Sequence, residues 1–213
     1  MEFTIDLDAS IRHLRPVTAP LVAEASHDAA LAAAARQGDR SAFAALYARY
    51  APMVHGMLLA RVPAVEVDDL VQDVFLQALR RLYTLREPAA FGGWLAMIAR
   101  NRASDFHRRS TPTQELPEEL PGGHGGAAQR AEALKVLAVI KALPEAYRET
   151  LVLRLVEGMT GPEIAARTGC TSASVRVNLH RGMKLLREKL GLPGATSRPD
   201  PSVGSKDWST GHE

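Results

Sequence analysis

The C-terminal half of the chain carries a cationic stretch whose residue types and spacing fit contacts to DNA. Between Arg176 and Lys189 there are five Lys and Arg residues against one acidic residue, Glu188. Apolar residues recur there at helical spacing, so the cations lie on the remaining faces of a helix. Such a helix can lie in a major groove, with its N-terminal residues near base edges and its cations near phosphates. The positions expected to face outward are Ala173, Arg176, Val177, His180, Arg181 and Lys184.

The residues just before this stretch predict a second, shorter helix. Thr160 and Glu163 are spaced as a capping box, in which the two residues exchange hydrogen bonds across the first helical turn. The helix from Glu163 to Arg167 ends at Gly169, and Thr171 can cap the basic helix that follows. A short helix, a glycine turn and a basic helix are typical of a helix-turn-helix. The alternative is a surface helix that its charges merely solvate, and the combination of all three features favours DNA binding.

Residues 68–82 predict a strongly amphipathic helix with a second face of interest. Its apolar stripe comprises Leu70, Val71, Val74, Phe75, Ala78, Leu79 and Leu82. The opposite side carries Asp69, Gln72, Asp73, Leu76 and Arg80. An exposed leucine among acids and amides is typical of a protein-docking surface, although single apolar residues are common on surfaces. The aspartates lack the glycine-bent loop or histidine spacing of a metal site, so we expect no bound metal.

Residues 90–109 predict a further helix with a cationic face. Its core stripe comprises Phe91, Trp94, Leu95, Ile98 and Phe106. The opposite face comprises Met97, Arg100, Asn101, Ser104 and Arg108, with His107 and Arg109 next to it. Cations with amide and aromatic neighbours suit a phosphate backbone and unstacked bases. A plain solvated face is the alternative.

No constellation of residues indicates catalysis. The seven histidines are dispersed without paired ligand spacing, and no convergent polar site is visible. Cys170, the single cysteine, falls at the turn of the helix-turn-helix, where we expect a buried packing residue. We therefore expect neither an enzyme nor a cofactor.

Composition predicts an all-α protein. Of 213 residues, 46% are hydrophobic and 23% are charged, which is ordinary for a globular chain. Alanine and leucine are abundant and runs of β-branched residues are scarce, which favours helices over sheets. The net charge of +2 averages over unlike segments. The N-terminus lacks the order of a signal peptide, and no apolar run approaches the ~18–20 residues of a membrane span. We expect a cytoplasmic protein that does not insert into membranes.

Two small helical domains joined by a flexible Pro/Gly linker are predicted, the second containing the helix-turn-helix. Residues 111–127 read TPTQELPEELPGGHGGA and cannot bury a helical face. In the front domain the first helix is expected from Ala29 to Arg36, and the second continues past Pro52 to Leu58. The predicted divisions are an N-terminal extension at 1–27, domains at 28–110 and 128–191, the linker between them, and a disordered tail at 192–213.

These motifs resemble a known family. The segment Asp68-Asp-Leu-Val-Gln-Asp-Val-Phe-Leu76, followed by Phe91-Gly-Gly-Trp-Leu-Ala-Met-Ile-Ala-Arg-Asn-Arg-Ala-Ser-Asp-Phe-His-Arg-Arg109, resembles region 2 of bacterial sigma factors of the extracytoplasmic-function (ECF) group. Leu143-Pro-Glu-Ala-Tyr-Arg148, Glu157-Gly-Met-Thr-Gly-Pro-Glu-Ile-Ala-Ala-Arg-Thr-Gly169 and the helix to Leu190 resemble region 4. The resemblance covers about residues 29–190, and the order of the motifs is more specific than either alone.

The resemblance implies a role for each of three surfaces. Core RNA polymerase, through its clamp and flap, and promoter DNA are the implied partners, with an anti-sigma factor as the implied regulator. The implied clamp contacts are Asp69, Gln72, Asp73 and Leu76. The implied contacts to the melted minus-ten element are Arg100, Asn101, Ser104, Arg108 and Arg109, together with the loop 86–90. The implied readers of the minus-thirty-five element are Ser172, Ala173, Ser174, Arg176, Val177, His180, Arg181 and Lys184.

The reading helix departs from the usual pattern of the family. Where the family often has Gly-Thr-Val-Lys-Ser-Arg, this chain has Ala173-Ser-Val-Arg-Val-Asn178, which changes the base edges that the helix can meet. Gly182 replaces a common alanine, at a cost of about 1 kcal/mol in a helix. The sequence therefore leaves the preferred promoter open.

Two other classes of function are alternatives to the transcription initiation factor that the resemblance implies. A free-standing helix-turn-helix repressor or activator usually binds duplex DNA as a dimer, and the sequence has no obvious dimerisation helix or ligand pocket. A helical enzyme needs a convergent polar site. The acidic docking face and the cationic helix ending at Arg109 favour the initiation factor, because a simple repressor needs neither.

Overall fold

The computed structural model describes residues 19–109 and 127–192, and in these ranges the chain is helical with no β-strand. The α-helices are α2 (Ala19–Arg36), α3 (Arg40–Leu59), α4 (Val67–Arg81), α5 (Phe91–Arg109), α6 (Ala127–Lys141), α7 (Glu145–Leu155), α8 (Gly161–Thr168) and α9 (Ser172–Leu190). Short 3₁₀ helices occupy Ala64–Glu66, Leu82–Thr84 and Pro88–Ala90. The predicted all-α class is confirmed. Residues 1–18, 110–126 and 193–213, which hold most of the predicted extension, linker and tail, lie outside the described ranges.

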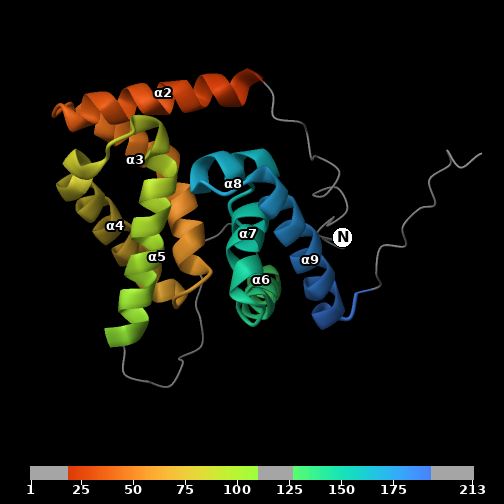
Figure 1. Cartoon of the computed structure of the whole chain (residues 1–213). Helices are drawn as coiled ribbons and strands as arrows, with labels where there is room; N and C mark the ends of the chain where they lie inside the picture. Colours follow the sequence, from red (N-terminus) through yellow and green to blue (C-terminus); the bar gives the residue numbers. More distant parts are fainter. Residues whose placement is uncertain (1–18, 110–126, 193–213) are drawn as a thin grey trace, which may run out of the picture.

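Helices α3, α4 and α5 form a bundle, and α2 lies across one end of it (Figure 1). The periodic apolar residues of the sequence meet in its core, where Leu46, Met53, Val74 and Leu95 are fully buried. Asp39 caps α3 by accepting hydrogen bonds from the backbone of Ser41 and Ala42 at 2.8 and 3.1 Å. The bundle thus presents the outer faces of α4 and α5 on a rigid support.

The first helix begins earlier than predicted, at Ala19 rather than Ala29. Weak periodicity hid its first turns, but alanine and leucine favour a helix on propensity alone, and Pro20 fits the first turn, where its missing N–H is not needed. Asp28 of α2 is buried, accepts a hydrogen bond from Tyr50 at 2.9 Å and pairs with Arg49 at 2.6 Å. The helix is therefore joined to α3 by polar as well as apolar contacts.

The apolar stripe predicted for α4 is buried except at one position. Leu79 is 50% exposed, contrary to the prediction, while Ala78 next to it is fully buried. Consecutive helical residues are separated by about 100°, so Leu79 turns away from the face that α3 and α5 cover. The outer face of α4 is consequently more apolar than the sequence indicated.

The capping box and the glycine turn of the helix-turn-helix are both confirmed. Glu163 accepts from the Thr160 backbone at 2.7 Å and its own N–H donates to the Thr160 hydroxyl at 3.4 Å. Helix α8 is longer than predicted by residues at both ends. Gly169 ends it with φ +73°, a left-handed conformation that other residues rarely adopt. Thr171 then caps α9 by accepting from the Ser174 backbone at 3.1 Å.

Removing the Thr160 cap of α8 should measurably destabilise the back half. We expect Thr160→Ala to lower the free energy of unfolding by about 1 kcal/mol, because α8 loses one bonded N–H and the Glu163 carboxylate loses its hydroxyl partner. Urea unfolding followed by circular dichroism measures the change. Thr84→Ala is the matched control, since its hydroxyl also bonds backbone but lies on the exposed surface of the front half. An equal loss in both variants would contradict the prediction.

The two halves of the chain pack directly against each other. In Figure 1, α7 and α8 lie beside the bundle formed by α3, α4 and α5. Leu153 and Glu157 of the back half reach α3 at Gly56, and the backbone of Arg167 in α8 abuts the start of α5 at Gly92. The buried side chains of both halves form one continuous apolar cluster. The predicted domains are therefore in contact in this structure.

Candidate nucleic-acid and polymerase interfaces

Every residue predicted to read duplex DNA lies on the exposed surface of α9. The apolar spacing of this helix predicts a buried stripe of Val175, Leu179, Met183, Leu186 and Leu190. The first four are buried against the rest of the back half, and Leu190 is partly buried. The exposed positions are Ser172, Ala173, Ser174, Arg176, Val177, His180, Arg181 and Lys184. Val177 is 43% exposed and adds an apolar patch to the otherwise polar and cationic surface. The surface begins at the N-terminus of α9, where helix N–H groups also favour an anion such as phosphate.

The glycine inside α9 has a packing reason. Gly182 is buried, and a Cβ there would lie 3.0 Å from Tyr147 and 3.1 Å from Leu151 of α7. An alanine would force these side chains to move. Glycine lowers the helix propensity of α9, but it allows α7 and α9 to approach closely. This close approach sets the orientation of the reading helix.

Cys170 is exposed, contrary to the prediction of a buried packing residue. The buried place at this turn is taken by Thr168, which is 3% exposed and donates its hydroxyl to the Ile164 carbonyl at 2.6 Å. The backbone N–H of Cys170 donates to the same hydroxyl oxygen at 3.4 Å. The buried side chain thus lies two residues earlier than predicted, because residue spacing does not specify which side chain faces inward at an irregular turn.

The cationic face predicted for α5 is exposed, except at Arg100, which is partly buried. Asn101, Ser104, Arg108 and Arg109 are exposed, as is Met97 at 55%. Ser104 donates its hydroxyl to the Arg100 carbonyl at 3.0 Å, and Arg108 pairs with Asp105 one turn away. Arg108 and Arg109 are thus placed on the last turn of α5 with their charges at the surface.

Arg100 points toward the back half of the chain. Its guanidinium donates to both carboxylate oxygens of Glu149 in α7, from Nη2 at 2.7 Å and from Nε at 3.1 Å. Arg61, which follows α3, approaches the same carboxylate at 2.7 Å. Burial alone raises the pKa of Glu149, but the two guanidinium groups outweigh it and hold that pKa below its ordinary value. Glu149 is therefore ionised at neutral pH and is fully engaged by two cations.

The outer face of α4 carries the four residues predicted to dock on polymerase. Asp69, Gln72 and Leu76 are exposed, and Leu76 is 51% exposed. Asp73 is half-buried and pairs with Arg102 of α5. Leu79 and Tyr83 extend the exposed apolar surface at 50% and 78%. The combination is a mixed acidic and apolar face, in which Asp73 also joins α4 to α5.

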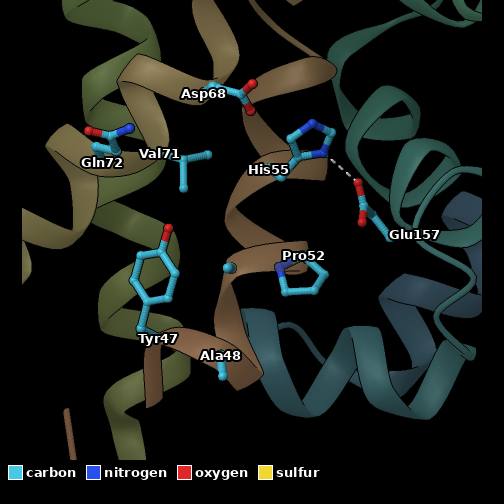
Figure 2. Close-up of a pocket in the computed structure, with 9 residues that line it drawn as sticks. Tyr47, Ala48, Pro52, His55, Asp68, Val71, Gln72 and Glu157 are labelled. Atoms are coloured by element: carbon cyan, nitrogen blue, oxygen red, sulfur yellow. Dashed lines mark hydrogen bonds and ion pairs between the residues drawn. The ribbon is translucent and has the colours of Figure 1, made fainter. Parts of the chain in front are cut away.

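A groove of about 560 Å³ lies where this face meets the back half (Figure 2). Tyr47 and Pro52 of α3, and Val71 and Gln72 of α4, line one part of it. His55 of α3 also lines the groove, and its Nδ1 donates at 2.7 Å to the carboxylate of Glu157, which follows α7. The docking face on α4 is therefore continuous with the contact between the two halves.

The His55–Glu157 pair gives this contact a pH dependence. The hydrogen bond to Glu157 raises the pKa of His55 above its ordinary value, against the opposing effect of burial. A raised folded-state pKa means that the stabilisation is complete below the unfolded pKa of about 6.5 and is lost as pH rises through the folded value. Because the His55 side chain is 34% exposed, solvent screening keeps the effect below about 1 kcal/mol.

We therefore expect the free energy of unfolding to fall by roughly 0.5 kcal/mol more in the wild type than in His55→Gln between pH 6 and pH 8.5. The variant keeps a hydrogen-bonding side chain but does not titrate. Urea unfolding at each pH measures both proteins. Parallel pH profiles for the two would contradict the assignment, since other titrating groups contribute equally to each.

Sequence reasoning missed the residues that join the two halves. Glu149, Arg61, His55 and Glu157 were not singled out, and the partners of Arg100 and Asp73 were not foreseen. The one local signal was an acid among buried positions of α7, since Thr150, Leu151 and Glu149 are all buried. That signal marks a charge in need of a partner but does not say where the partner lies.

Within the described ranges, no group of three or more His, Cys, Asp or Glu residues is placed to hold a metal ion. Among the same residues, no helix has the length and apolar character to cross a membrane.

Comparison with known proteins identifies two regions of this chain. Residues 46–113 match the family model of sigma-70 region 2, and residues 133–186 match that of sigma-70, region 4. The RNA polymerase sigma factor NccH of Alcaligenes xylosoxydans xylosoxydans is 32% identical over 173 residues, covering 73% of this chain and 90% of the relative. The ECF RNA polymerase sigma factor SigD of Mycobacterium tuberculosis is 32% identical over 179 residues, covering 78% and 84%. The solved structure of CnrH in complex with the cytosolic domain of CnrY aligns with a TM-score of 0.56 at 29% identity, covering 78% of this chain and 97% of that one.

A helical region that precedes a helix-turn-helix region, each with its own matching model, defines the class of two-region transcription initiation factors. The chain belongs to the sigma-70 family, in its group of ECF RNA polymerase sigma factors. Alternative sigma factors bind core RNA polymerase and direct it to a subset of promoters, and the resemblance first noted in the sequence motifs is confirmed.

Proposed function

We propose that three surfaces of this chain divide the work of promoter recognition. The outer face of α4, with Asp69, Gln72, Asp73 and Leu76, docks on the polymerase clamp. The last turns of α5 hold the separated minus-ten strand through Asn101, Ser104, Arg108 and Arg109, joined by Arg100. The exposed face of α9, from Ser172 to Lys184, reads the minus-thirty-five duplex. The division into a front domain at 28–110 and a back domain at 128–191 belongs to the same proposal.

One observation carries the proposal furthest: the acidic-apolar, cationic and helix-turn-helix surfaces occupy separate exposed helix faces on one folded chain. A repressor needs only the third of these. The charge of each face suits its partner, because phosphates require cations and a basic protein surface requires acids. Catalysis is left to the polymerase, and the chain itself needs no cofactor.

Regulation by an anti-sigma factor, and a role in response to stress, complete the proposal. Support comes from the solved complex of CnrH with the cytosolic domain of CnrY, to which this chain is similar over most of its length. Such a regulator would act where core polymerase and DNA are found, in the cytoplasm.

Run-off transcription tests the proposed function. Purified core polymerase is assayed with and without this protein on a library of promoter fragments. Specific transcripts that depend on the protein are the expected result, and their start sites deliver the promoter sequence. A protein that yields no transcript and does not bind core polymerase would reject the proposal and favour a free-standing DNA-binding regulator.

A further inference from the structure

An apolar side chain, that of Val177, lies at the centre of the exposed face of α9. The buried residues of this helix are Val175, Leu179, Gly182, Met183 and Leu186. Because consecutive residues of an α-helix are turned by about 100°, Val177 points about 180° away from the mean direction of those five residues. It also lies within the first two turns of α9, the part that a recognition helix presents to base edges. Its isopropyl group therefore occupies the part of α9 that would enter a major groove most deeply.

Cationic side chains flank this apolar position. Arg176 precedes Val177, whereas Arg181 and Lys184 follow it by one and two turns, and all three are exposed. Positive charge on both sides of an apolar group suits the phosphates at the edges of a groove, with the apolar group against the bases between them. Duplex DNA is thus a partner whose charge complements this face.

The residue one turn before Val177 is apolar as well. Ala173 is exposed and offers no hydrogen-bonding group. Beside it, the Thr171 hydroxyl donates to the Ser174 hydroxyl at 2.8 Å and accepts from the Ser174 backbone at 3.1 Å, so both side chains take part in the helix cap. Where the family often has a serine, this chain has Val177. The centre of the reading face is therefore apolar in this chain, although the cations at its sides are retained.

Among the base edges of the major groove, the 5-methyl group of thymine is the apolar partner that suits an isopropyl group. The other groups that distinguish the bases there are hydrogen-bond donors and acceptors. The Val177 side chain has neither, so a polar edge that it covers loses water without gaining a hydrogen bond. This side chain favours thymine in two ways, by apolar contact with the methyl group and by the cost of covering a more polar edge.

We propose that Val177 is a specificity-determining residue, which selects a thymine in the minus-thirty-five element by contact with the 5-methyl group of that base. The inference rests on the proposed reading of duplex DNA by α9 and deepens it, because it names a base that the element contains. Arg176 supplies hydrogen bonds beside this contact, whereas Val177 supplies an apolar surface. The preferred promoter therefore carries a T·A pair, in one orientation or the other, opposite the centre of α9.

The first measurement selects duplexes from a library that carries a randomised stretch, using holoenzyme formed from core polymerase and the full-length chain. Wild type, Val177→Ser and Val156→Ser are compared. Val156→Ser is the matched control, because this valine is 50% exposed but follows α7 and lies off the reading face. Valine and serine have similar helix propensities, so the substitution at Val177 leaves α9 intact. We expect the wild type and the control to enrich a thymine at one position, and Val177→Ser to enrich it about three- to fivefold less.

The second measurement replaces the selected thymine by deoxyuridine, which keeps the hydrogen-bonding groups of thymine and lacks only its 5-methyl group. We expect the affinity of the wild-type holoenzyme to fall about three- to fivefold, the effect of one buried methyl group, and that of Val177→Ser to change by less than about 1.5-fold. Deoxyuridine at a thymine outside the selected stretch is the control on the DNA side. The wild-type result needs no protein variant, so it decides the matter even if Val177→Ser is misfolded.

The outcomes separate this inference from the proposed function. A wild type that loses no affinity with deoxyuridine would overturn the role of Val177, and so would equal losses in the wild type and Val177→Ser, since the methyl group would then act through DNA shape. A selected sequence that is the same in all three proteins leaves the proposed function standing and rejects only the contact to thymine. A wild type that selects no sequence at all would instead reject the reading of duplex DNA by α9, and with it the proposed function.

Discussion

Asp69→Lys is expected to weaken binding of core RNA polymerase by roughly 10- to 100-fold while leaving the fold intact. Asp69 is exposed on the outer face of α4, next to Gln72 and one turn from Asp73. A lysine there would meet the basic surface that an acidic docking face implies, and like charges brought together across an interface cost several kcal/mol. A binding titration with labelled core polymerase measures the loss.

Asp68→Lys is the matched control for this prediction. Asp68 and Asp69 are neighbours in the first turn of α4, so both lysines disturb the helix dipole equally. The Asp68 side chain, however, borders the groove toward His55 (Figure 2). Equal affinities for the two variants would remove Asp69 from the interface.

Asp73 is a poorer choice for such an experiment than its sequence position indicates. Its pairing with Arg102 means that Asp73→Lys would set two cations against each other between α4 and α5. The resulting loss of stability would accompany any loss of polymerase binding. Leu76→Ala tests the same face without this complication, because its side chain is half exposed and uncharged.

Arg176→Ala is expected to lower the affinity of the holoenzyme for its promoter by about 5- to 150-fold and to relax sequence preference at one position of the minus-thirty-five element. Arg176 lies in the first turns of α9, where a recognition helix meets base edges, and its side chain is exposed. A guanidinium that donates two hydrogen bonds to a base edge carries about 1–3 kcal/mol of discrimination. Competition between promoter variants, measured with the fragments found by run-off transcription, gives both quantities.

Lys189→Ala removes the same charge from the other end of α9 and serves as the control. It lies more than three turns from Arg176, too far along the axis to share its base contacts. We expect less than a twofold effect from it. If Lys189→Ala weakened the promoter complex as much as Arg176→Ala, binding would depend on overall charge rather than on a reading surface.

Much of this fold follows from local signals in the sequence. The apolar periodicity of residues 68–82 and 90–109 predicts α4 and α5 almost to their ends, because amphipathic helices bury one stripe wherever they pack. The cap at Thr160 and the turn at Gly169 each depend on a few neighbouring residues, so the helix-turn-helix is predicted without knowledge of any tertiary contact. The candidate DNA and polymerase surfaces follow from the same periodicity, since a helix with one buried face must expose the others.

Local signals failed at two positions that were predicted to be buried. Leu79, assigned to the core by its spacing, and Cys170, assigned by its type and its place in the turn, are exposed, whereas Ala78 and Thr168 are buried. The start of α2 was missed because an alanine-rich helix has little periodicity to read.

By itself the sequence determined the helices, their caps, the order of the two regions and the family to which the chain belongs. Only the tertiary structure decided which charges meet. Glu149 and Arg100 are 49 residues apart, and His55 and Glu157 are 102 apart, so no local pattern relates them. The physical reason is that a buried charge is stable only beside its partner, and the partner is selected by how whole helices pack, not by spacing along the chain.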